Sequence, residues 1–310
     1  MGTTYHITII ASFYELTGHL NTKIAKRLDQ IEQSMSTFRK NSEISRFNNL
    51  KQLGKPFEIS KDFMEVMSKS QYLYKITDGA WDGTIHPLLD LWGFYDYTKI
   101  HHVPDDEQIK QVLTKIGFNH IEIKKSKTAG GCLEKKHTEI SVDLASIAKG
   151  YGVDKIAELI HQNGFDNFLV EIGGEIYARG LRKDGKHWVV GVNTPKKGAG
   201  STEVYKALPL TDRAMATSGD YRNYFKKNGK FYSHIIDPKT GYSVQNNVVS
   251  ASVIAKTCTI ADGLATAFMV MGPEKSIELA ESLDGVECLV IVRDSDDTLT
   301  DHYSSGFETF

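Results

Sequence analysis

Several features that would assign this chain to a simple functional class are missing from its sequence. Its three cysteines, Cys132, Cys258 and Cys288, show neither CxxC nor zinc-type spacing, and they neither require nor exclude an oxidising compartment. No apolar run approaches the roughly 18 residues that a membrane-spanning helix needs. The 37 lysines and arginines nearly balance the 39 aspartates and glutamates. That balance leaves no electrostatic case for binding nucleic acid or an anionic membrane.

Signatures of common nucleotide and nucleophile sites are also lacking. Gly173 and Gly174 follow an apolar run but do not complete the GxGxxG spacing, so a Rossmann site is not supported. There is no GxSxG motif, and no linker, low-complexity tract or internal repeat. Helical and strand-like patterns mix without regular βαβ alternation. The sequence therefore favours one α+β domain over residues 1–310.

Hydrophobic periodicity predicts where these helices and strands lie. Helices are expected over residues 19–36, 61–76, 105–116, 144–163, 259–271 and 273–283. Strands are expected over residues 5–12, 119–124, 138–142, 167–179, 187–192, 231–236, 248–255 and 286–292. The lysines at 124–127 and 135–136 flank Gly130 and Gly131, and we expect them to form a solvated hairpin.

The stretch 233–241, Ser-His-Ile-Ile-Asp-Pro-Lys-Thr-Gly, places an imidazole close to a carboxylate and a turn. Pro238 fixes φ and Gly241 supplies a positive φ, so residues 237–241 are predicted to form a rigid turn. His234 titrates near neutral pH, which suits proton transfer. By itself the stretch fits a structural turn with an incidental histidine equally well.

Two further motifs place oxygen atoms where a phosphate and a divalent cation can be held. Asp143 is predicted at a helix N-cap with Ser146 in the first turn, and such helix ends bind phosphate. Asp262 and Thr266 are i,i+4 on one helix face, and hard oxygen ligands beside a phosphate are typical of Mg²⁺ sites. The plainer interpretations are a simple cap at Asp143, a capping Asp262, and a Thr266 that bonds back within its helix.

Two loops carry groups that suit a flat or polar ligand. Residues 78–87 contain two carboxylates, two glycines and Trp81; glycines allow close backbone approach, and an aromatic ring can stack on another ring. Trp81 fits a core residue equally well, and His86 fits a structural role better than a catalytic one. Residues 217–222, Thr-Ser-Gly-Asp-Tyr-Arg, offer hydroxyls, backbone groups and one cation.

Taken together, these motifs resemble those of the FAD:protein FMN transferases, the ApbE-type flavin transferases. The resemblance runs in collinear order over essentially the whole chain, and its specificity comes from the joint occurrence of motifs that are each weak alone. The motifs that carry it are 1–5 (MGTTY), 35–38 (MSTF), 42–48 (SEISRFN), 78–82 (DGAWD), 87–94 ending in LWGF, 143–146 (DLAS), 173–174 (GG), 217–219 (TSG), 234–241 (HIIDPKTG) and 261–266 (ADGLAT).

The resemblance implies an ApbE-like α+β domain of T-fold type that binds FAD between two lobes around a cleft. It implies Mg²⁺-dependent transfer of FMN from FAD to a threonine or serine hydroxyl of an acceptor flavoprotein, of the redox-pump subunit type, with release of AMP. Mg²⁺ spreads the charge of a pyrophosphate, which makes AMP a better leaving group. A hydroxyl nucleophile also needs a base to take its proton.

The resemblance also implies roles for individual residues. His234 is the candidate base. The metal is expected at Ser146, Asp262 and Thr266. The FAD contacts are expected at Met1, Phe38, Ala80, Trp81, Asp82, Asp143, Lys149 and Ile236. Two residues depart from the pattern of the family. Lys149 stands where some relatives carry an acidic residue, and Ala265 stands where some place a second aspartate near the metal.

Two other functions fit the same motifs. A Mg²⁺-dependent FAD pyrophosphatase would use water in place of the hydroxyl, and a non-catalytic flavin-binding protein would hold FAD without turnover. Family members usually carry an export signal or lipoprotein leader ahead of the Met-Gly-Thr motif with which this chain begins. We therefore expect a removed leader and a periplasmic protein, an inner-membrane lipoprotein in its full-length form, with a cytoplasmic member as the alternative.

Overall fold

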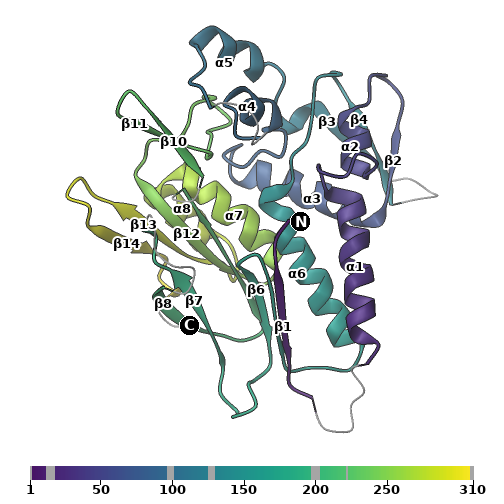
Figure 1. Cartoon of the computed structure of the whole chain (residues 1–310), viewed down its shortest axis with the longest axis vertical. Coiled ribbons are helices and arrows are strands. Elements are labelled where there is room, and N and C mark those ends of the chain that lie inside the picture. Colours follow the sequence, from purple (N-terminus) through teal and green to yellow (C-terminus); the bar gives the residue numbers. More distant parts are fainter. Residues whose placement is uncertain are drawn as a thin grey trace. The chain divides into compact units, whose positions relative to one another are not determined.

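Residues 2–11, 18–95, 101–124, 130–196, 203–220 and 223–307 are described by a computed structural model, in which the chain divides into two units. Unit 1 comprises residues 1–30, 147–222 and 246–310, and unit 2 comprises residues 31–146 and 223–245. Two helices, α1 (Leu20–Met35) and α6 (Ala145–Gln162), begin in one unit and continue into the other (Figure 1). The expectation of one domain over 1–310, with two lobes around a cleft, stays a prediction.

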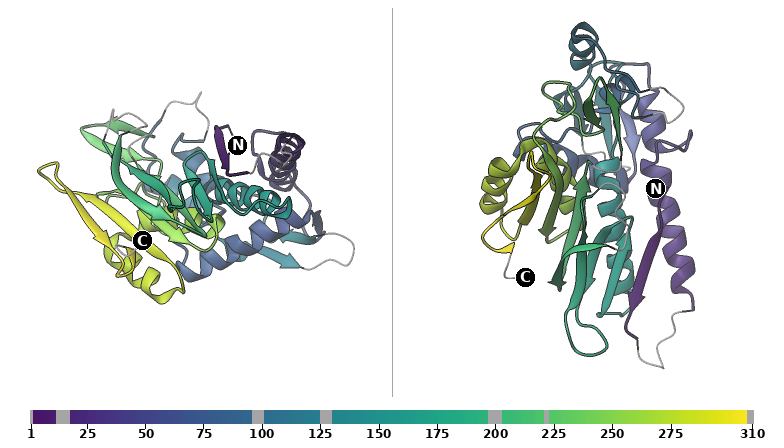
Figure 2. Two further views of the ribbon diagram at one scale, coloured as in Figure 1. Left: turned by 90° about the horizontal axis from the view of Figure 1, so that it is seen from below. Right: turned by 60° about the vertical axis from the view of Figure 1, so that its left-hand side comes forward.

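A seven-stranded sheet forms the centre of unit 1 (Figure 2). Its strands, in spatial order, are β1 (Tyr5–Ile9), β5 (Phe168–Ile172), β6 (Glu175–Arg179), β9 (Arg213–Gly219), β12 (Val248–Ala255), β13 (Glu287–Arg293) and β14 (Leu299–Tyr303). All neighbouring strands run antiparallel. The unit also contains α7 (Cys258–Met271), α8 (Pro273–Ser282) and the ribbon of β7 (Trp188–Asn193) and β8 (Val204–Leu210). An antiparallel sheet with helices confirms the predicted α+β class.

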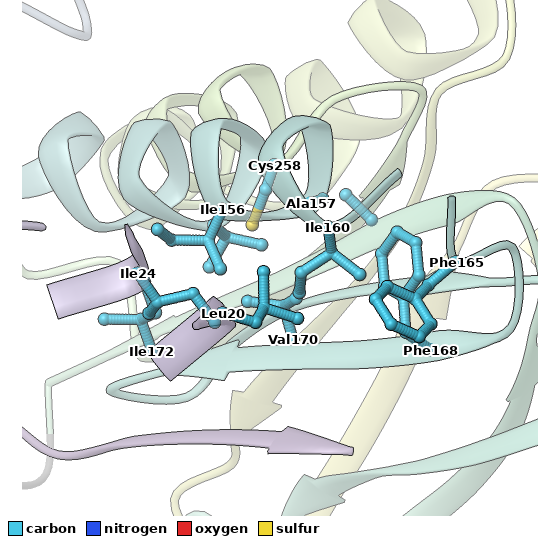
Figure 3. Packing of buried hydrophobic residues seen from close by; sticks show 12 residues of the cluster. Leu20, Ile24, Ile156, Ala157, Ile160, Phe165, Phe168, Val170, Ile172 and Cys258 are labelled. Carbon is cyan, nitrogen blue, oxygen red and sulfur yellow. The ribbon is translucent and has the colours of Figure 1, made fainter. Parts of the chain in front are cut away.

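Each face of this sheet buries its own apolar cluster, because successive residues of a strand point to opposite faces. On one face, alternate residues of β5 pack against α6 and the first turns of α1 (Figure 3). On the other face, the sheet packs against β7 and β8. The alternation is clear on β9, where Ala214 belongs to the first cluster and Met215 to the second. β12 is buried at every residue, as expected for a central strand.

The described residues of unit 2 form helices of different lengths and two small sheets. Its helices are α2 (Glu43–Asn48), α3 (Lys61–Ile76), α4 (His86–Leu91) and α5 (Asp106–Leu113), with a 3₁₀ turn over Phe118–His120. Its strands form the sheet β2–β4–β3 (Phe57–Ile59, Gly131–Lys135, Ile121–Lys124) and the hairpin β10–β11 (Tyr224–Lys227, Lys230–Ser233). An apolar cluster that includes Trp92 and Ile236 packs α4 and α5 together.

Side-chain caps explain why several of these helices begin where they do. The hydroxyls of Ser42 and Ser60 accept backbone N–H groups in the first turns of α2 and α3. Asp105 and Gln108 form a reciprocal capping box at the start of α5. Within the described ranges, no helix combines the length and the apolar character needed to cross a bilayer.

In unit 2, one predicted strand is wrong, and the predicted solvated hairpin is wrong for one of its lysines. Residues 138–142 do not form a strand, because Val142 exchanges backbone hydrogen bonds with the side chain of Asn48 (2.7 and 2.9 Å). The hairpin predicted around Gly130 and Gly131 is present, because β3 pairs antiparallel with β4, and Lys124 and Lys136 are exposed. Lys135 is not solvated: it is only 5% exposed, on the central strand β4, and its Nζ donates to the Asn48 carbonyl at 2.9 Å. Burial lowers the pKa of Lys135 to about 8.

Candidate active site

The sequence motifs gather into two groups, one in each unit. Contacts in unit 1 join the N-terminal motif, α6, the Gly173–Gly174 turn, β9 and α7. Contacts in unit 2 join the 42–48 segment, the 78–83 loop, the start of α6 and the 234–241 turn. Met1, Tyr221 and Arg222 lie outside the described residues, so the predicted FAD contact at Met1 stays a prediction.

In unit 1, Asp262 and Thr266 lie one turn apart on α7, and both bind partners outside that helix. Asp262 is 2% exposed, and its Oδ2 accepts the backbone N–H of Gly150 at 2.9 Å. Thr266 Oγ1 lies 3.1 Å from Ser218 Oγ on β9. Since α7 begins at Cys258, Asp262 does not cap it. The plainer interpretation of this pair as a cap and a back-bonded threonine is therefore wrong.

Lys149 completes a charged cluster with two buried carboxylates. Its Nζ lies 3.4 Å from Asp262 Oδ1 and 3.4 Å from Glu175 Oε1. Burial alone would lower the pKa of Lys149, but the two carboxylates outweigh it and raise the pKa. Burial raises the pKa of Glu175, with Lys149 opposing the shift and Asp262 adding to it. The cluster therefore holds an ammonium between two acids, one of them on α7.

The oxygen atoms on α7 fit a Mg²⁺ ion. Asp262 supplies a carboxylate and Thr266 a hydroxyl, which are hard donors of the kind Mg²⁺ prefers. The nearby Lys149 ammonium shows that this carboxylate already attracts a cation. Among the described residues, no group of three histidine, cysteine, aspartate or glutamate side chains could hold a metal. Mg²⁺ tolerates such a sparse site because water and substrate phosphates complete its coordination.

The N-terminal motif reaches the same cluster through Gly173. Gly173 N–H donates to the Thr4 carbonyl at 3.0 Å. A side chain at Gly173 would place its Cβ 2.9 Å from Thr3 Cγ2 and 3.2 Å from Lys149 Cδ. With φ of +63° at Gly173 and +103° at Gly174, the turn between β5 and β6 also requires glycine. The two glycines thus serve a tight turn beside Lys149, not a Rossmann loop.

Close packing of α6 on α7 sets the position of Asp262. A Cβ at Gly150 would lie 2.6 Å from the Cys258 carbonyl carbon and 2.8 Å from Asp262 Cβ. We expect Gly150→Ala to lower the unfolding free energy by about 1–3 kcal/mol, the usual range for overpacking. Thermal unfolding measures this loss. Gly18→Ala is the matched control, because no described residue lies within 4 Å of the added methyl group. Equal melting temperatures for the two variants would contradict the packing argument.

Asp154 on α6 supplies the cap that α7 lacks in its own sequence. Its carboxylate accepts the N–H groups of Cys258 (2.7 Å) and Thr259 (2.9 Å), and also the Thr259 hydroxyl. Thr257, at the formal N-cap, makes no side-chain capping bond. Burial nevertheless outweighs these hydrogen bonds and raises the pKa of Asp154 from 3.8 to about 6.

This raised pKa predicts a specific pH dependence of stability. The folded chain binds the Asp154 proton more tightly than the unfolded chain, so protonation of Asp154 stabilises the fold. This stabilisation is complete below about pH 4 and is lost as the pH rises through 6. Asp154→Asn removes it. We therefore expect the unfolding free energy of the parent chain minus that of Asp154→Asn to fall between pH 4 and 7 in urea titrations. A difference that is constant or rises with pH would contradict the assignment.

In unit 2, Trp81 positions the start of α6. The indole is 2% exposed, and its Nε1–H donates to Ser146 Oγ at 3.0 Å. Asp143 Oδ1 accepts the N–H of Ala145, the first residue of α6, at 2.7 Å, and Asp143 N–H donates to the Gly83 carbonyl at 2.8 Å. Of the two interpretations of Trp81, the buried residue is the one that the structure favours. Asp143 caps the helix as expected.

The other predicted FAD contacts differ in exposure: those of the 78–82 loop are buried, whereas Phe38 is exposed. Asp82 is buried, and its Oδ1 accepts the N–H (2.8 Å) and the hydroxyl (2.7 Å) of Thr84. Burial raises the pKa of Asp82 to about 6. Ala80 is 8% exposed, whereas Phe38 is 77% exposed. Phe38 therefore has a ring face available for a ligand, while Asp82 holds its own loop together.

The turn at 237–241 is rigid, as the sequence predicts. Asp237 Oδ1 accepts the Lys239 N–H, and the Gly241 N–H donates to the Asp237 carbonyl, both at 2.8 Å. Gly241 has a φ of +76°. Lys239 pairs with Asp78, which ties the turn to the 78–82 loop. Trp92 Nε1–H donates to the Gly241 carbonyl at 2.9 Å.

His234 is oriented by a backbone carbonyl and not by the turn's carboxylate. Its Nδ1 lies 3.1 Å from the Asn223 carbonyl oxygen, and no hydrogen bond to Asp237 is found between these two described residues. A carbonyl only accepts, so Nδ1 carries the proton and Nε2 is left with the lone pair. Burial lowers the pKa of His234 below its ordinary 6.5, with the Asn223 hydrogen bond opposing the shift. The ring is therefore a neutral base at neutral pH. The predicted contact Ile236 is 4% exposed and packs with Trp92.

Three residues that matter to the site were not identified from the sequence. Glu175 follows the Gly-Gly turn, Asp154 lies within α6, and Asn223 precedes β10. Asp154 stands in α6 together with other charged residues, Lys149, Lys155 and Glu158, so its charge alone gave no signal. Asn223 contributes only its backbone carbonyl, for which the side chain gives no signal.

Known proteins resemble this chain over nearly all of its length. Residues 1–290 match the model of the ApbE family. The chain is 41% identical over 311 residues to the FAD:protein FMN transferase of Vibrio cholerae serotype O1 (100% of this chain, 90% of the relative). It is 33% identical over 310 residues to that of Escherichia coli strain K12 (100% and 87%).

Solved structures agree with the sequence matches. The flavin transferase ApbE of Vibrio cholerae has a TM-score of 0.88 at 40% identity, covering 100% of this chain and 96% of that chain. The apo form of the Pseudomonas stutzeri flavinyl transferase ApbE has a TM-score of 0.88 at 33% identity (99% and 93%). Fold and matches together define an α+β enzyme of the flavin transferase class. Within that class, the chain belongs to the ApbE family, and the predicted family, fold class and enzyme class are confirmed.

Proposed function

We propose that this chain transfers FMN from FAD to a threonine or serine hydroxyl of an acceptor flavoprotein and releases AMP. The observation that supports this most directly is the oxygen pair Asp262 and Thr266 on α7, in a chain that aligns along its whole length with FAD:protein FMN transferases. From the resemblance alone, we also propose a redox-pump type of acceptor, met on the periplasmic side by a lipoprotein form of the enzyme.

The metal site of this proposal uses Asp262 and Thr266 of α7, with Ser146 as the third residue. The buried carboxylate and the hydroxyl support a hard cation. Ser146 Oγ accepts the Trp81 indole N–H, which fixes its orientation at the start of α6. A bound Mg²⁺ would spread the charge of the pyrophosphate and make AMP a better leaving group.

His234 is the proposed base for the acceptor hydroxyl. Its Nδ1–H is held by the Asn223 carbonyl, so Nε2 carries the lone pair that would accept the proton. The hydroxyl oxygen forms a bond to the phosphorus of the FMN half. The bond from that phosphorus to the bridging oxygen breaks, AMP leaves with the bridging oxygen, and the hydroxyl proton passes to Nε2.

The FAD contacts of the proposal fall on both units. In unit 2 they are the exposed Phe38 ring, the Ala80–Asp82 segment, Asp143 and Ile236. In unit 1 they are Met1 and Lys149, whose ammonium suits a phosphate. The exposure of Phe38 supports its role most directly, because a large exposed ring is available to stack on a flat ligand.

Product analysis with and without an acceptor tests this function. The protein is incubated with FAD and Mg²⁺, either alone or with a candidate acceptor domain that contains the target threonine, and AMP and FMN are quantified by chromatography. We expect AMP to form when the acceptor is present. Equal amounts of AMP and free FMN without acceptor would identify a pyrophosphatase, and tight FAD binding without AMP would identify a flavin-binding protein.

A further inference from the structure

We propose that Lys149 is a tethered cation that competes with Mg²⁺ for Asp262, and that Glu175 is the second partner that draws Lys149 away when the metal binds. This inference rests on the proposed function, since it concerns the metal placed at Asp262. It assigns Lys149 and Glu175 as positioning residues that set the metal affinity of the site.

The geometry places Lys149 between two equivalent partners. Its Nζ is 3.4 Å from an oxygen of each carboxylate, longer than the 2.7–2.9 Å of a strong charge-assisted hydrogen bond. The ammonium is therefore shared, and neither carboxylate holds it tightly. Its side chain is 27% exposed, whereas those of Glu175 and Asp262 are 4% and 3% exposed. The lysine is therefore the most exposed member of the cluster.

Glu175 has an unused acceptor in the right place for such a movement. Its Oε2 is buried and finds no hydrogen-bond partner among the described residues. A buried acceptor without a partner costs free energy, so it favours any arrangement that supplies a donor. An ammonium that leaves Asp262 can supply one without leaving the cluster. Glu175 directly follows the positive-φ turn at Gly173 and Gly174, which fixes the position of its backbone.

The charges make the lysine and the metal alternatives at Asp262. The carboxylates of Asp262 and Glu175 share a single ammonium, so Asp262 can exchange that ammonium for another cation. A divalent ion on Asp262 would nevertheless lie close to the Lys149 ammonium, and like charges at such separations repel by kilocalories per mole even at an effective dielectric constant of about 20. Metal binding at Asp262 therefore requires Lys149 to withdraw toward Glu175.

Mg²⁺ titrations of the FAD-free protein by isothermal calorimetry, at one fixed pH, test this inference without turnover. We expect Lys149→Met to tighten Mg²⁺ binding by about tenfold or more, because the competing cation is gone. Lys149→Arg keeps the charge and should stay near the parent affinity. Glu175→Gln should weaken binding severalfold, because the glutamate charge that draws Lys149 away from Asp262 is then gone. Unchanged or weaker binding in Lys149→Met would overturn the competition.

The double variant Lys149→Met/Glu175→Gln shows whether Glu175 acts on the metal affinity through Lys149 or directly. If Glu175 acts through Lys149, Glu175→Gln weakens Mg²⁺ binding less in the Lys149→Met background than in the parent chain. An effect at least as large in both backgrounds would show direct action on the metal and would overturn the assigned role. If a thermal melt shows that Lys149→Met does not fold, the Mg²⁺ affinity of Glu175→Gln alone tests the inference. Unchanged or tighter Mg²⁺ binding in Glu175→Gln would then overturn it.

Asp262→Asn distinguishes a failure of this inference from a failure of the metal site. If Asp262→Asn loses Mg²⁺ binding while Lys149→Met equals the parent chain, the metal site stands and only the competition is wrong. If Asp262→Asn binds Mg²⁺ like the parent chain, the metal is not at Asp262, and the metal assignment and the inference both fail.

Discussion

Asp262→Asn is expected to lower the rate of Mg²⁺-dependent FMN transfer by about 100-fold or more, because metal stabilisation of transition-state charge is worth several kcal/mol. The substitution removes the only carboxylate in the proposed ligand set of Ser146, Asp262 and Thr266. An amide oxygen can still accept the Gly150 N–H, so the α6–α7 contact is largely kept. AMP release measured by chromatography in the presence of acceptor gives the rate, and higher Mg²⁺ concentrations should restore part of it.

The matched control for this substitution is Asp284→Asn. Asp284 also lies in unit 1, but its side chain is 90% exposed and pairs with Lys256 at the surface. We expect this variant to keep the parent rate and nearly the parent stability, since exposed ion pairs contribute little. Parent activity in Asp262→Asn, with a similar melting temperature, would contradict the metal assignment.

His234→Ala is expected to lower the transfer rate by about 10²–10⁴-fold while FAD affinity stays unchanged, the usual contribution of a general base. The ring is held through Nδ1 by the Asn223 carbonyl, so the substitution removes Nε2 without removing a ligand of the proposed metal. Stopped-flow or discontinuous transfer assays give the rate, and fluorescence titration gives the FAD affinity.

The pH profile supplies a second readout for the same residue. Because burial lowers the pKa of His234 below 6.5, the parent rate should hold down to about pH 6.5 and decline only in more acidic solution, as the ring gains its proton. His234→Ala should lack this acid limb. His187→Ala, an exposed histidine of unit 1, is the control and should keep it. A full transfer rate in His234→Ala at unchanged FAD affinity would exclude His234 as the base.

Local sequence patterns predicted the regular elements well where burial is one-sided or complete. The helix over 61–76 and the strand over 248–255 have the predicted bounds, because an apolar stripe or a continuous apolar run defines each of them. Pattern reasoning failed at 138–142, whose backbone bonds to the Asn48 side chain. The decisive partner lies 94 residues away, and no local pattern reports it.

The candidate site shows the same division between local and distant causes. The capping role of Asp143 and the turn at 237–241 follow from neighbouring residues, and the sequence predicted both. The partners of Asp262 and the tautomer of His234 depend on Gly150, Lys149 and the Asn223 carbonyl. The contacts of Asp262 form only when distant segments pack together, and the contact of His234 depends on the pairing of β10 with β11. Residue chemistry alone could propose the ligands and the base, but not that Lys149 lies beside the proposed metal ligand Asp262.

The most direct test of the proposed transfer is intact-mass spectrometry of an acceptor flavoprotein after incubation with this protein, FAD and Mg²⁺. We predict a covalent FMN adduct on one threonine or serine, formed together with AMP and absent when that residue is replaced by alanine. An acceptor of unchanged mass, together with FMN and AMP free in solution, would contradict the transfer.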